Sequence, residues 1–419
     1  MSGHKNILLN DIAGSGRSVI SGPFGSNVGK RYFKKTGIPL IRGNNLTTDF
    51  TKFIDQGFTF LTEQKADELK ADAVRGDILF TAAGTIGQVG MIPENSEYER
   101  YVISNKQLRF RVDSKKADAE YVYYWLASPW IYKAILNRNT GSTVPLINLG
   151  IIKSLPLSIP NDIQDQKKIA NIFSIIDKKI ELNNKINSEL EATAKLIYDY
   201  WFVQFDFADE NGKPYKFSGG KMVYNEELKR EIPEGWNVEE LQSIATNIMG
   251  QSPSGESYNS EAVGMPLLNG PADYKNGALF GRTYTTSPTR LCKKDDMVLC
   301  IRATIGNLVY SEGEFCLGRG VAAVRPHKEE SSELIYFLLQ QEIKRFKIQA
   351  TGSIIKGITK DDLVESICLI PKENTVLEFH KIIKPMFDKQ RKAKTENLNL
   401  IDLRDWLLPM LMNGQVKIK

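Results

Sequence analysis

The chain has 419 residues, a length that predicts two or three hydrophobic cores rather than one. Hydrophobic residues make up 42% of it and aromatic residues 10%, which excludes a disordered chain. The net charge of +5 is too small to establish a nucleic-acid partner by itself. No apolar stretch approaches the roughly 18 residues of a membrane span, and residues 1–6 lack a signal-peptide apolar region, so we expect a cytoplasmic protein without membrane contact.

Positive charge is concentrated at the start of the chain. Residues 1–160 hold 20 Lys and Arg against 14 Asp and Glu, whereas residues 236–371 hold 14 against 16. A DNA-binding surface in the second segment would therefore need its positive side chains gathered on one face. The four cysteines lie in the second half without zinc-ligand spacing, so we expect reduced, buried thiols and no metal site.

The first segment predicts a β-rich domain followed by helices. Residues 76–89 predict a strand, a glycine-containing turn and a second strand. A helix is expected over 119–136, with Tyr123, Tyr124 and Trp125 in a stripe that faces the core. A Thr-Gly-Ser turn at 140–142 and a short strand ending at Pro160 complete this segment.

A long helix is expected from about 163 to 202, with Asp162 as its N-cap. Apolar residues recur along it every seven positions, and Asn183 stands where one buried asparagine would fix the register of a coiled coil. The polar, glycine-containing stretch after it predicts an exposed connection with turns.

The same series of segments then returns, which indicates an internal duplication. Five matches occur in the same order, namely 37–41 with 264–268, 76–80 with 295–299, 83–87 with 302–306, 140–142 with 351–353, and 151–160 with 362–371. The second copy predicts a helix over 332–348 and a long helix from about 375 to 413, in which Pro385 should introduce a kink or mark the first turn.

Each long helix needs a partner for its apolar stripe. Helices of this length span roughly 60 Å, and antiparallel pairing of the two would bury both stripes and place the globular domains at opposite ends of a coiled-coil spacer. The alternative is that each helix packs on its own domain. We take seven residues of the heptad rows as partner-binding positions, namely Ile169, Ile176, Asn183, Leu190, Met386, Leu400 and Leu407.

No catalytic residues are expected. The chain lacks both a glycine-rich cofactor loop and the Asn/Asp-Pro-Pro-aromatic motif of a methyltransferase. Residues 25–30 are one residue short of a phosphate-binding loop, and Arg31 replaces the Ser or Thr that would hold magnesium. The histidines His4, His327 and His380 form no cluster in the sequence, and spacing alone leaves a nuclease-type carboxylate set open.

The order of motifs resembles the specificity subunit of a type I restriction-modification system over essentially the whole chain. The motifs that carry the resemblance are 76–79, 84–87, 164–170, 200–202 and 232–236. The resemblance implies an α+β fold, with two target-recognition domains of mixed α/β type separated by two long antiparallel coiled-coil helices in a pseudo-twofold tandem repeat. The expected boundaries are domain 1 at 1–160, spacer helix 1 at 161–203, a connector at 204–235, domain 2 at 236–371, and spacer helix 2 at 372–413 with a tail to 419.

The resemblance also implies a non-catalytic role in reading double-stranded DNA. Each domain would read one half of a bipartite, asymmetric site, and the helices would dock two methyltransferase subunits and set the spacing of the half-sites. S-adenosylmethionine would belong to the methyltransferase, and ATP and magnesium to restriction subunits of the same complex. The second helix lacks the glutamine-rich start at 164–166, so the two docking sites would differ in strength. A helical adaptor without a DNA role, and an autonomous nuclease or methyltransferase, remain as alternatives.

Base edges are read by Arg, Lys, Asn, Gln or Thr on loops that a rigid core holds in place. In the first domain the candidates are Arg42, Asn44, Asn45, Lys106, Gln107, Thr140 and Ser142. In the second domain, by analogy between the repeats, they are Asn269, Tyr274, Lys275, Arg302, Thr304, Arg319, Thr351, Ser353 and Lys356. An Asx-type turn at 42–45 and a plain turn at 139–143 are equally open interpretations.

Overall fold

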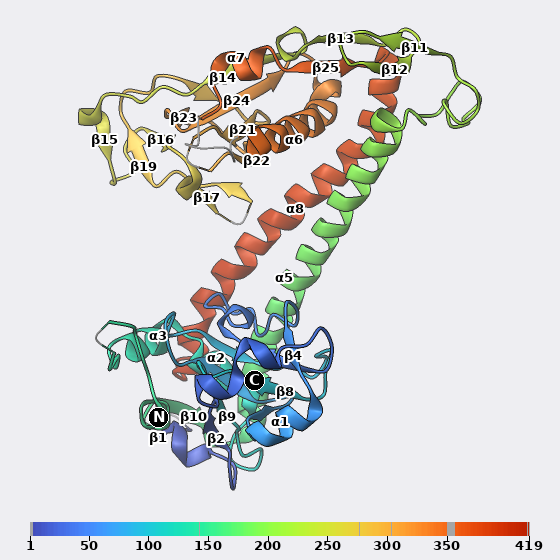
Figure 1. Cartoon of the computed structure of the whole chain (residues 1–419). Helices are drawn as coiled ribbons and strands as arrows, with labels where there is room; N and C mark the ends of the chain where they lie inside the picture. Colours follow the sequence, from blue (N-terminus) through green and yellow to red (C-terminus); the bar gives the residue numbers. More distant parts are fainter. Residues whose placement is uncertain are drawn as a thin grey trace. The chain divides into compact units, whose positions relative to one another are not determined.

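The computed structural model describes residues 3–141, 143–275, 277–302, 304–349 (without the side chain of Gln349), 357–416 and 418. The chain forms two compact units, each of which combines one globular domain with parts of both long helices (Figure 1). Unit 1 comprises Met1–Leu182 and Asn397–Lys419, and unit 2 comprises Asn183–Glu396. Each unit therefore draws on residues far apart in the sequence.

The first domain contains two four-stranded sheets and a short ribbon. The sheets have the strand orders β2-β9-β6-β7 and β4-β3-β8-β5, and β1 pairs antiparallel with β10 in the ribbon. All strand pairs are antiparallel except β3 with β8. The strands are β1 His4–Leu8, β2 Val19–Ser21, β3 Ile38–Ile41, β4 Thr59–Leu61, β5 Asp72–Ala73, β6 Ile78–Thr81, β7 Val89–Met91, β8 Tyr101–Ile103, β9 Gln107–Phe110 and β10 Pro156–Pro160.

The single helix expected over 119–136 is in fact two helices. After α1 (Glu63–Leu69), α2 spans Ala119–Leu126, α3 spans Pro129–Leu136 and α4 spans Leu149–Lys153. The break occurs because Ser128 caps a new helix, accepting from the Ile131 amide, and Pro129 occupies its first turn. Tyr123 and Tyr124 are fully buried, and Trp125 nearly so, as the aromatic stripe predicted.

The second domain repeats this plan. The order β14-β24-β21-β22 corresponds to the first sheet of domain 1, and β13 pairs with β25 as β1 does with β10. A second sheet, β15-β19-β16-β23-β20, again contains one parallel pair, β16 with β23. The strands are β13 Asn237–Glu240, β14 Ala245–Met249, β15 Tyr258–Asn259, β16 Met265–Leu268, β17 Tyr274–Lys275, β18 Ala278–Leu279, β19 Thr283–Thr285, β20 Leu291–Cys292, β21 Met297–Cys300, β22 Gly306–Tyr310, β23 Phe315–Leu317, β24 Val321–Pro326 and β25 Ile367–Ile370.

An ion pair made by a buried aspartate is repeated as well as the strands. Asp77 accepts two hydrogen bonds from the Arg111 guanidinium, at 2.6 and 2.7 Å, and Asp296 accepts two from Arg325, at 2.8 and 2.7 Å. Each aspartate also accepts from a backbone amide three residues before it. The sequence matches therefore reflect a duplication of both sheet order and interior polar contacts. The helices of this domain are α6 (Ser332–Gln349) and α7 (Lys360–Val364).

The two long helices pair antiparallel in each unit. The first, α5 (Ile163–Tyr198), continues as a π-helical turn over Asp199–Val203, and the second is α8 (Glu373–Met412). In unit 2 the Asn183 amide donates to Glu396 at 2.8 Å, and the Gln390 amide donates to the Asn187 carbonyl at 2.9 Å. In unit 1, Arg404 donates to Asp177 at 3.1 Å. In unit 2 the later residue on α5, Asn187, contacts the earlier residue on α8, Gln390, which is the order of an antiparallel pair.

Each helix also packs on a domain, so the two arrangements weighed from the sequence both occur. Phe173 of α5 and Leu408 of α8 belong to the core of unit 1, and Tyr198 and Phe379 belong to that of unit 2. One of the two expectations for Pro385 was that it marks the first turn of the second long helix. This expectation was wrong, because α8 begins at Glu373 and continues past Pro385. No helix in the described part of the chain is long and apolar enough to cross a membrane.

The connector is more ordered than its composition indicates. It contains a hairpin of β11 (Met222–Asn225) and β12 (Arg230–Pro233). Phe205 and Phe207 are buried against Trp236, with ring centroids 5.6 and 5.0 Å from it. The connector therefore covers one end of the unit 2 core instead of forming only an exposed loop.

Candidate nucleic-acid interface

Backbone hydrogen bonds bring the loops of the first domain together. We call residues 22–27, 41–45, 82–87, 104–107 and 145–147 the first loop cluster. The bonds that join it are Gly22 N to Gln107 O at 2.9 Å, Ser104 N to Ile41 O at 2.9 Å, Ala82 N to Lys106 O at 2.7 Å and Ile147 N to Ala82 O at 2.8 Å. These loops follow strands of two different sheets, so a rigid scaffold holds them.

The second domain joins its loops by the same four bonds. We call residues 250–252, 268–275, 301–302, 318–320 and 357–358 the second loop cluster. Its bonds are Gly250 N to Val321 O at 3.0 Å, Gly318 N to Leu268 O at 2.7 Å, Ile301 N to Gly320 O at 3.0 Å and Ile358 N to Ile301 O at 2.8 Å. The matched bonds give a residue-by-residue alignment of the two clusters that does not depend on sequence identity.

The alignment shows that matched positions carry different side chains. One residue beyond the matched carbonyls of Ile41 and Leu268 stand Arg42 and Asn269. One residue beyond the matched amides of Ser104 and Gly318 stand Asn105 and Arg319. Equivalent backbones thus present different hydrogen-bonding groups, which is the property required to read two different base sequences.

Three candidates in the first loop cluster reach solvent. Asn44 and Lys106 are exposed, and Arg42 is half-buried, with its guanidinium donating to the Gly57 carbonyl at 3.4 Å. Thr140 is exposed and is linked to the cluster because its amide and hydroxyl both donate to the Leu146 carbonyl, at 3.0 and 3.1 Å. The structure therefore brings these four predicted residues to one region of the domain.

Two candidates of this cluster are buried. Asn45 is completely buried, donates to the carbonyls of Ile54 and Gln56 at 2.8 and 3.0 Å, and accepts from the Arg42 amide at 2.9 Å. Asn45 therefore stabilises this turn, but by accepting from an amide three residues before it, whereas an Asx turn needs an amide two residues after the asparagine. Gln107 is also completely buried, within β9, and its side chain accepts from the Ser104 hydroxyl. Neither amide is placed to meet a base edge in this conformation.

The candidates of the second loop cluster divide in the same way. The exposed side chains are those of Asn269, Lys275, Arg302 and Arg319, and also that of Thr304, which lies two residues beyond the cluster segment 301–302. The hydroxyl of Tyr274 is buried, and burial raises the pKa of this phenol, so the group does not face solvent. The remaining candidates, Ser142, Thr351, Ser353 and Lys356, lie outside the described residues.

The loops also contain exposed residues that sequence reasoning missed. Phe24, Asn105 and Gln251 are exposed, and all three lie in the matched clusters. Asn105 is the structural counterpart of Arg319, whereas the sequence had pointed to its neighbour Lys106, which follows the strand at 101–103. A signal for Phe24 was present in the flanking Gly22 and Gly25, because such residues often mark a close backbone approach.

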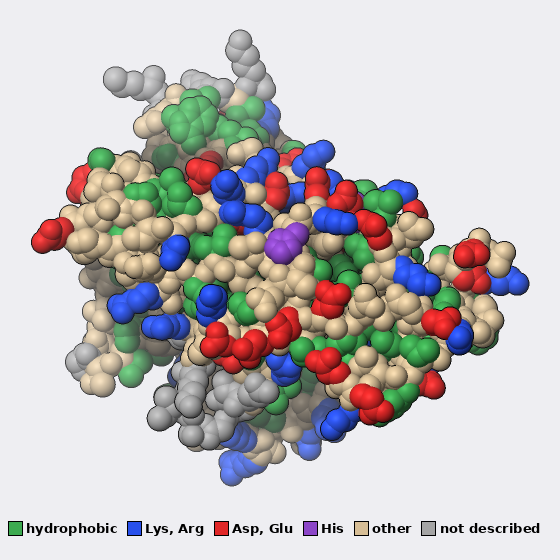
Figure 2. Space-filling view, turned by 90° about the horizontal axis from the view of Figure 1, so that it is seen from above, with side chains coloured by type: hydrophobic (Ala, Val, Ile, Leu, Met, Phe, Trp, Pro, Cys, Tyr) green, Lys and Arg blue, Asp and Glu red, His purple; other side chains and the backbone are tan. Residues whose placement is uncertain are grey.

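The surface charge of unit 2 is mixed where Figure 2 displays it. On the face seen from above, Lys and Arg side chains are interspersed with Asp and Glu rather than gathered into a broad positive area (Figure 2). In the second loop cluster the exposed cations are Lys275, Arg302 and Arg319, and Arg319 donates to the Ser252 hydroxyl at 3.2 Å. On the face that Figure 2 shows, positive charge is therefore local.

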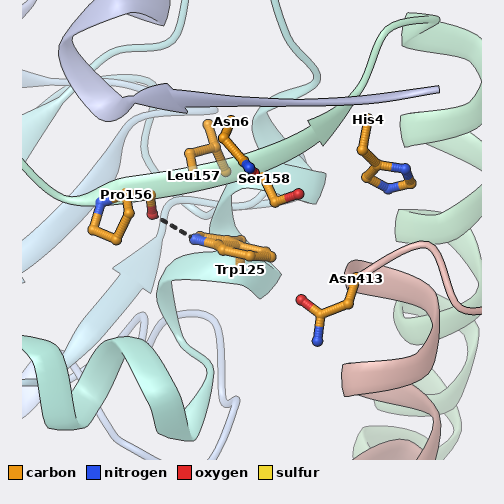
Figure 3. A pocket seen from close by; sticks show the side chains of 7 residues that line it. All are labelled: His4, Asn6, Trp125, Pro156, Leu157, Ser158 and Asn413. Carbon is orange, nitrogen blue, oxygen red and sulfur yellow. Dashed lines mark hydrogen bonds between the residues drawn. The ribbon is translucent and has the colours of Figure 1, made fainter. Parts of the chain in front are cut away.

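A pocket of about 400 Å³ in unit 1 lies outside the loop clusters. Figure 3 shows Trp125 donating to the Pro156 carbonyl, at 2.8 Å, with His4, Asn6, Ser158 and Asn413 around the opening. Burial lowers the pKa of His4, although Asp165 opposes this shift. The described residues contain no cluster of His, Cys, Asp or Glu fit for a metal ion. All four cysteines are free and buried, as their sequence spacing predicted.

The seven predicted partner-binding residues of the long helices are buried or partly buried by contacts within the chain. Ile169, Ile176 and Asn183 are buried, at 5%, 7% and 2% exposure, and Leu190, Met386, Leu400 and Leu407 are partly buried. Other apolar side chains of the long helices face solvent instead. These include Ile175, Leu182, Leu196, Leu403 and Trp406, which are 58%, 53%, 67%, 44% and 59% exposed.

Two β-rich domains with matched loop clusters, joined to paired long helices, define a tandem-repeat recognition scaffold. The family model described as the type I restriction modification DNA specificity domain matches residues 28–192 and 233–400, so the chain belongs to this family. Specificity subunits are the non-catalytic members of type I systems, and this chain is accordingly not an enzyme.

Curated relatives agree with this assignment. The chain is 23% identical over 398 residues to the type I restriction enzyme MjaIX specificity subunit of Methanocaldococcus jannaschii, covering 91% of this chain and 87% of the relative. It is 25% identical over 405 residues to the HindI specificity subunit of Haemophilus influenzae, covering 82% and 87%. The crystal structure of a type I S subunit from M. genitalium shares the fold, with a TM-score of 0.60, 16% identity and coverage of 98% and 96%.

Proposed function

We propose that the two domains of this specificity subunit each read one half of a bipartite, asymmetric DNA site. The observation that carries the proposal is the pair of loop clusters, which share four backbone hydrogen bonds but differ in the side chains at matched positions. Arg favours guanine and Asn favours adenine in the major groove. Arg42 and Asn44 are therefore the proposed readers of the first half-site, and Asn269 and Arg319 those of the second.

We assign the other exposed candidate residues to contacts with the DNA backbone. Lys106, Lys275 and Arg302 are exposed cations suited to phosphate oxygens, and the hydroxyls of Thr140 and Thr304 suit the same partner. Ser142 stays in the proposal because a hydroxyl in a turn suits a phosphate oxygen. Thr351, Ser353 and Lys356 stay in it from the sequence repeat alone. Asn45, Gln107 and Tyr274 are withdrawn from it, because their polar groups are buried.

The test is to change one cluster at a time in the full complex. Arg42→Ala with Asn44→Ala should relax the first half-site and leave the second unchanged, and Arg319→Ala should do the reverse. Each lost bidentate contact should reduce discrimination by about 1–3 kcal/mol. Methylation motifs mapped in host DNA supply the measurement, and Lys216→Ala in the connector is the control, since Lys216 is exposed outside both clusters. If either variant altered both halves, the two-reader proposal would fail.

We further propose that the long helices dock two methyltransferase subunits and set the gap between half-sites. The heptad-row side chains, which we call the seam, are buried or partly buried within the chain. Docking would therefore use the exposed apolar side chains, chiefly Ile175 and Leu182 on α5 and Leu403 and Trp406 on α8. S-adenosylmethionine would be held by the methyltransferase, and ATP and magnesium by restriction subunits of the assembled complex. This chain's own residues would supply positioning and sequence recognition.

A further inference from the structure

One exposed aromatic residue is held at the tip of the first loop cluster. Phe24 is 85% exposed and follows Pro23, whose ring restricts the backbone. A single exposed apolar side chain is common on protein surfaces and has no meaning alone. What distinguishes Phe24 is the rigidity of its loop and the charge around it.

The loop approaches the neighbouring turn too closely for ordinary residues. A Cβ atom on Gly22 would lie 1.7 Å from the Ser104 carbonyl oxygen, and one on Gly25 would lie 3.1 Å from the Asn105 side chain. Just after the tip, Val28 is buried in the domain core. A backbone contact at Gly22 and a side-chain contact at Gly25 thus hold the segment around Phe24 against the turn that carries Asn105 and Lys106.

The segment that carries this tip is rich in positive charge and contains no acidic residue. Between Asp11 and Asp49 the sequence contains six Lys and Arg residues and neither Asp nor Glu. They are Arg17, Lys30, Arg31, Lys34, Lys35 and Arg42. All are exposed except the half-buried Arg42, and none forms an ion pair within the described part of the chain. The segment therefore has the charge of a phosphate-backbone contact, with an aromatic ring projecting from it.

We propose that Phe24 acts as a wedge at a base step of the half-site that the first domain reads. An apolar side chain inserted at a step partly unstacks the bases and bends the duplex, while neighbouring cations hold the phosphates. Because unstacking is easiest at pyrimidine–purine steps, the wedge selects sequence through deformability and without hydrogen bonds. This inference rests on the proposed function, since it assigns Phe24 to the first DNA-reading domain.

The second domain lacks an equivalent wedge. Gly250 matches Gly22 through its backbone bond, and the residue two positions later is Ser252, whose hydroxyl accepts from Arg319. The preference for a deformable step should therefore appear in the first half-site and be absent from the second. This difference gives every experiment on the full complex an internal control.

The experiment selects duplexes from a randomised library with the full chain and its methyltransferase subunits. The wild type should enrich a pyrimidine–purine step in the first half-site. Phe24→Ala should lose that enrichment and bind the selected duplex about 5- to 100-fold more weakly. Phe24→Leu should retain most of both effects, because leucine is also an effective wedge. Phe217→Ala is the matched control, since Phe217 is 87% exposed on the connector.

A mismatch placed at the enriched step separates wedging from simple contact. The mismatch lowers the cost of unstacking. It should therefore raise the affinity of the wild type for the duplex and leave the affinity of Phe24→Ala unchanged. If Phe24→Ala keeps the enriched step and its affinity, or responds to the mismatch as the wild type does, the wedge is overturned and the proposed function stands. If the wild-type complex enriches no sequence, the proposed function fails and the wedge with it.

Discussion

Adjacent asparagines in the first loop cluster have opposite surroundings. The side chain of Asn44 is exposed, whereas Asn45 is completely buried and makes three hydrogen bonds to backbone groups. The same amide chemistry therefore serves a different purpose at each position. Asn44 is available to a ligand, and Asn45 fixes the turn that presents it, because it ties 42–45 to the segment at 54–56.

Replacing each asparagine with alanine should separate these roles. Asn45→Ala leaves the partly buried Arg42 amide and the carbonyls of Ile54 and Gln56 without this partner and should lower the free energy of unfolding by about 1–3 kcal/mol. Asn44→Ala should change it by less than about 0.5 kcal/mol while weakening DNA binding by the full complex. Urea unfolding and DNA titration supply the two measurements. A destabilised Asn44→Ala, or an Asn45→Ala as stable as the wild type, would contradict this assignment.

Sequence reasoning located these loops but not the direction of each side chain. Asn44 and Arg319 are exposed and Arg42 is half-buried, because they follow strands whose glycines and polar residues mark a turn. Asn45, Gln107 and Tyr274 were indistinguishable from them by type. Their burial depends on segments distant in sequence, such as 54–56 for Asn45, and a single sequence does not encode those contacts locally.

Among the elements, the long helices were the most predictable from the sequence. Their seven-residue apolar spacing gave both extents to within a few residues and indicated antiparallel pairing, since local periodicity reports directly which face is buried. The break between α2 and α3 was missed because the apolar spacing continues through Ser128 and Pro129. There the capping and proline signals outweigh periodicity.

Docking on α5 can be tested by charging its exposed face. Ile175→Glu with Leu182→Glu should weaken binding of the methyltransferase at least about tenfold, because two solvent-facing apolar contacts become charged. The unfolding free energy of the chain should change by less than about 0.5 kcal/mol per substitution. Titration of the purified methyltransferase into this chain measures the affinity.

The neighbouring position supplies the control for that experiment. Ile176 is only 7% exposed, so Ile176→Glu buries a charge in the seam and should destabilise the chain by about 3 kcal/mol or more. Equal affinity of the wild type and the exposed-face variant for the methyltransferase would place the docking surface elsewhere. If the exposed-face variant lost both its affinity for the methyltransferase and its free energy of unfolding, the exposed face would be part of the chain's own packing and not a docking surface.

At the scale of the whole molecule, the duplication explains why domains and helices are interleaved. Neither repeat forms a unit from its own residues alone, because unit 1 takes the end of α8 and unit 2 takes the end of α5. Leu408 and Leu411 complete the core of the first domain, and Tyr198 and Phe202 complete that of the second. The sequence predicted the repeat but assigned each long helix to one repeat. It did not predict that the end of each helix also packs on the other domain, because those contacts join residues far apart in the sequence.

The spacing role of the helices leads to a prediction about length. Inserting one heptad into both α5 and α8, at paired positions near Asn187 and Gln390, preserves the phase of the seam and adds about 10 Å of helix. The gap between half-sites should then lengthen by about three base pairs, since successive pairs rise about 3.4 Å, while the half-site sequences stay unchanged. Methylation motifs in the host genome measure both quantities. Inserting the heptad into α5 alone mismatches the seam and should abolish methylation, and an unchanged gap after the double insertion would exclude the helices as the ruler.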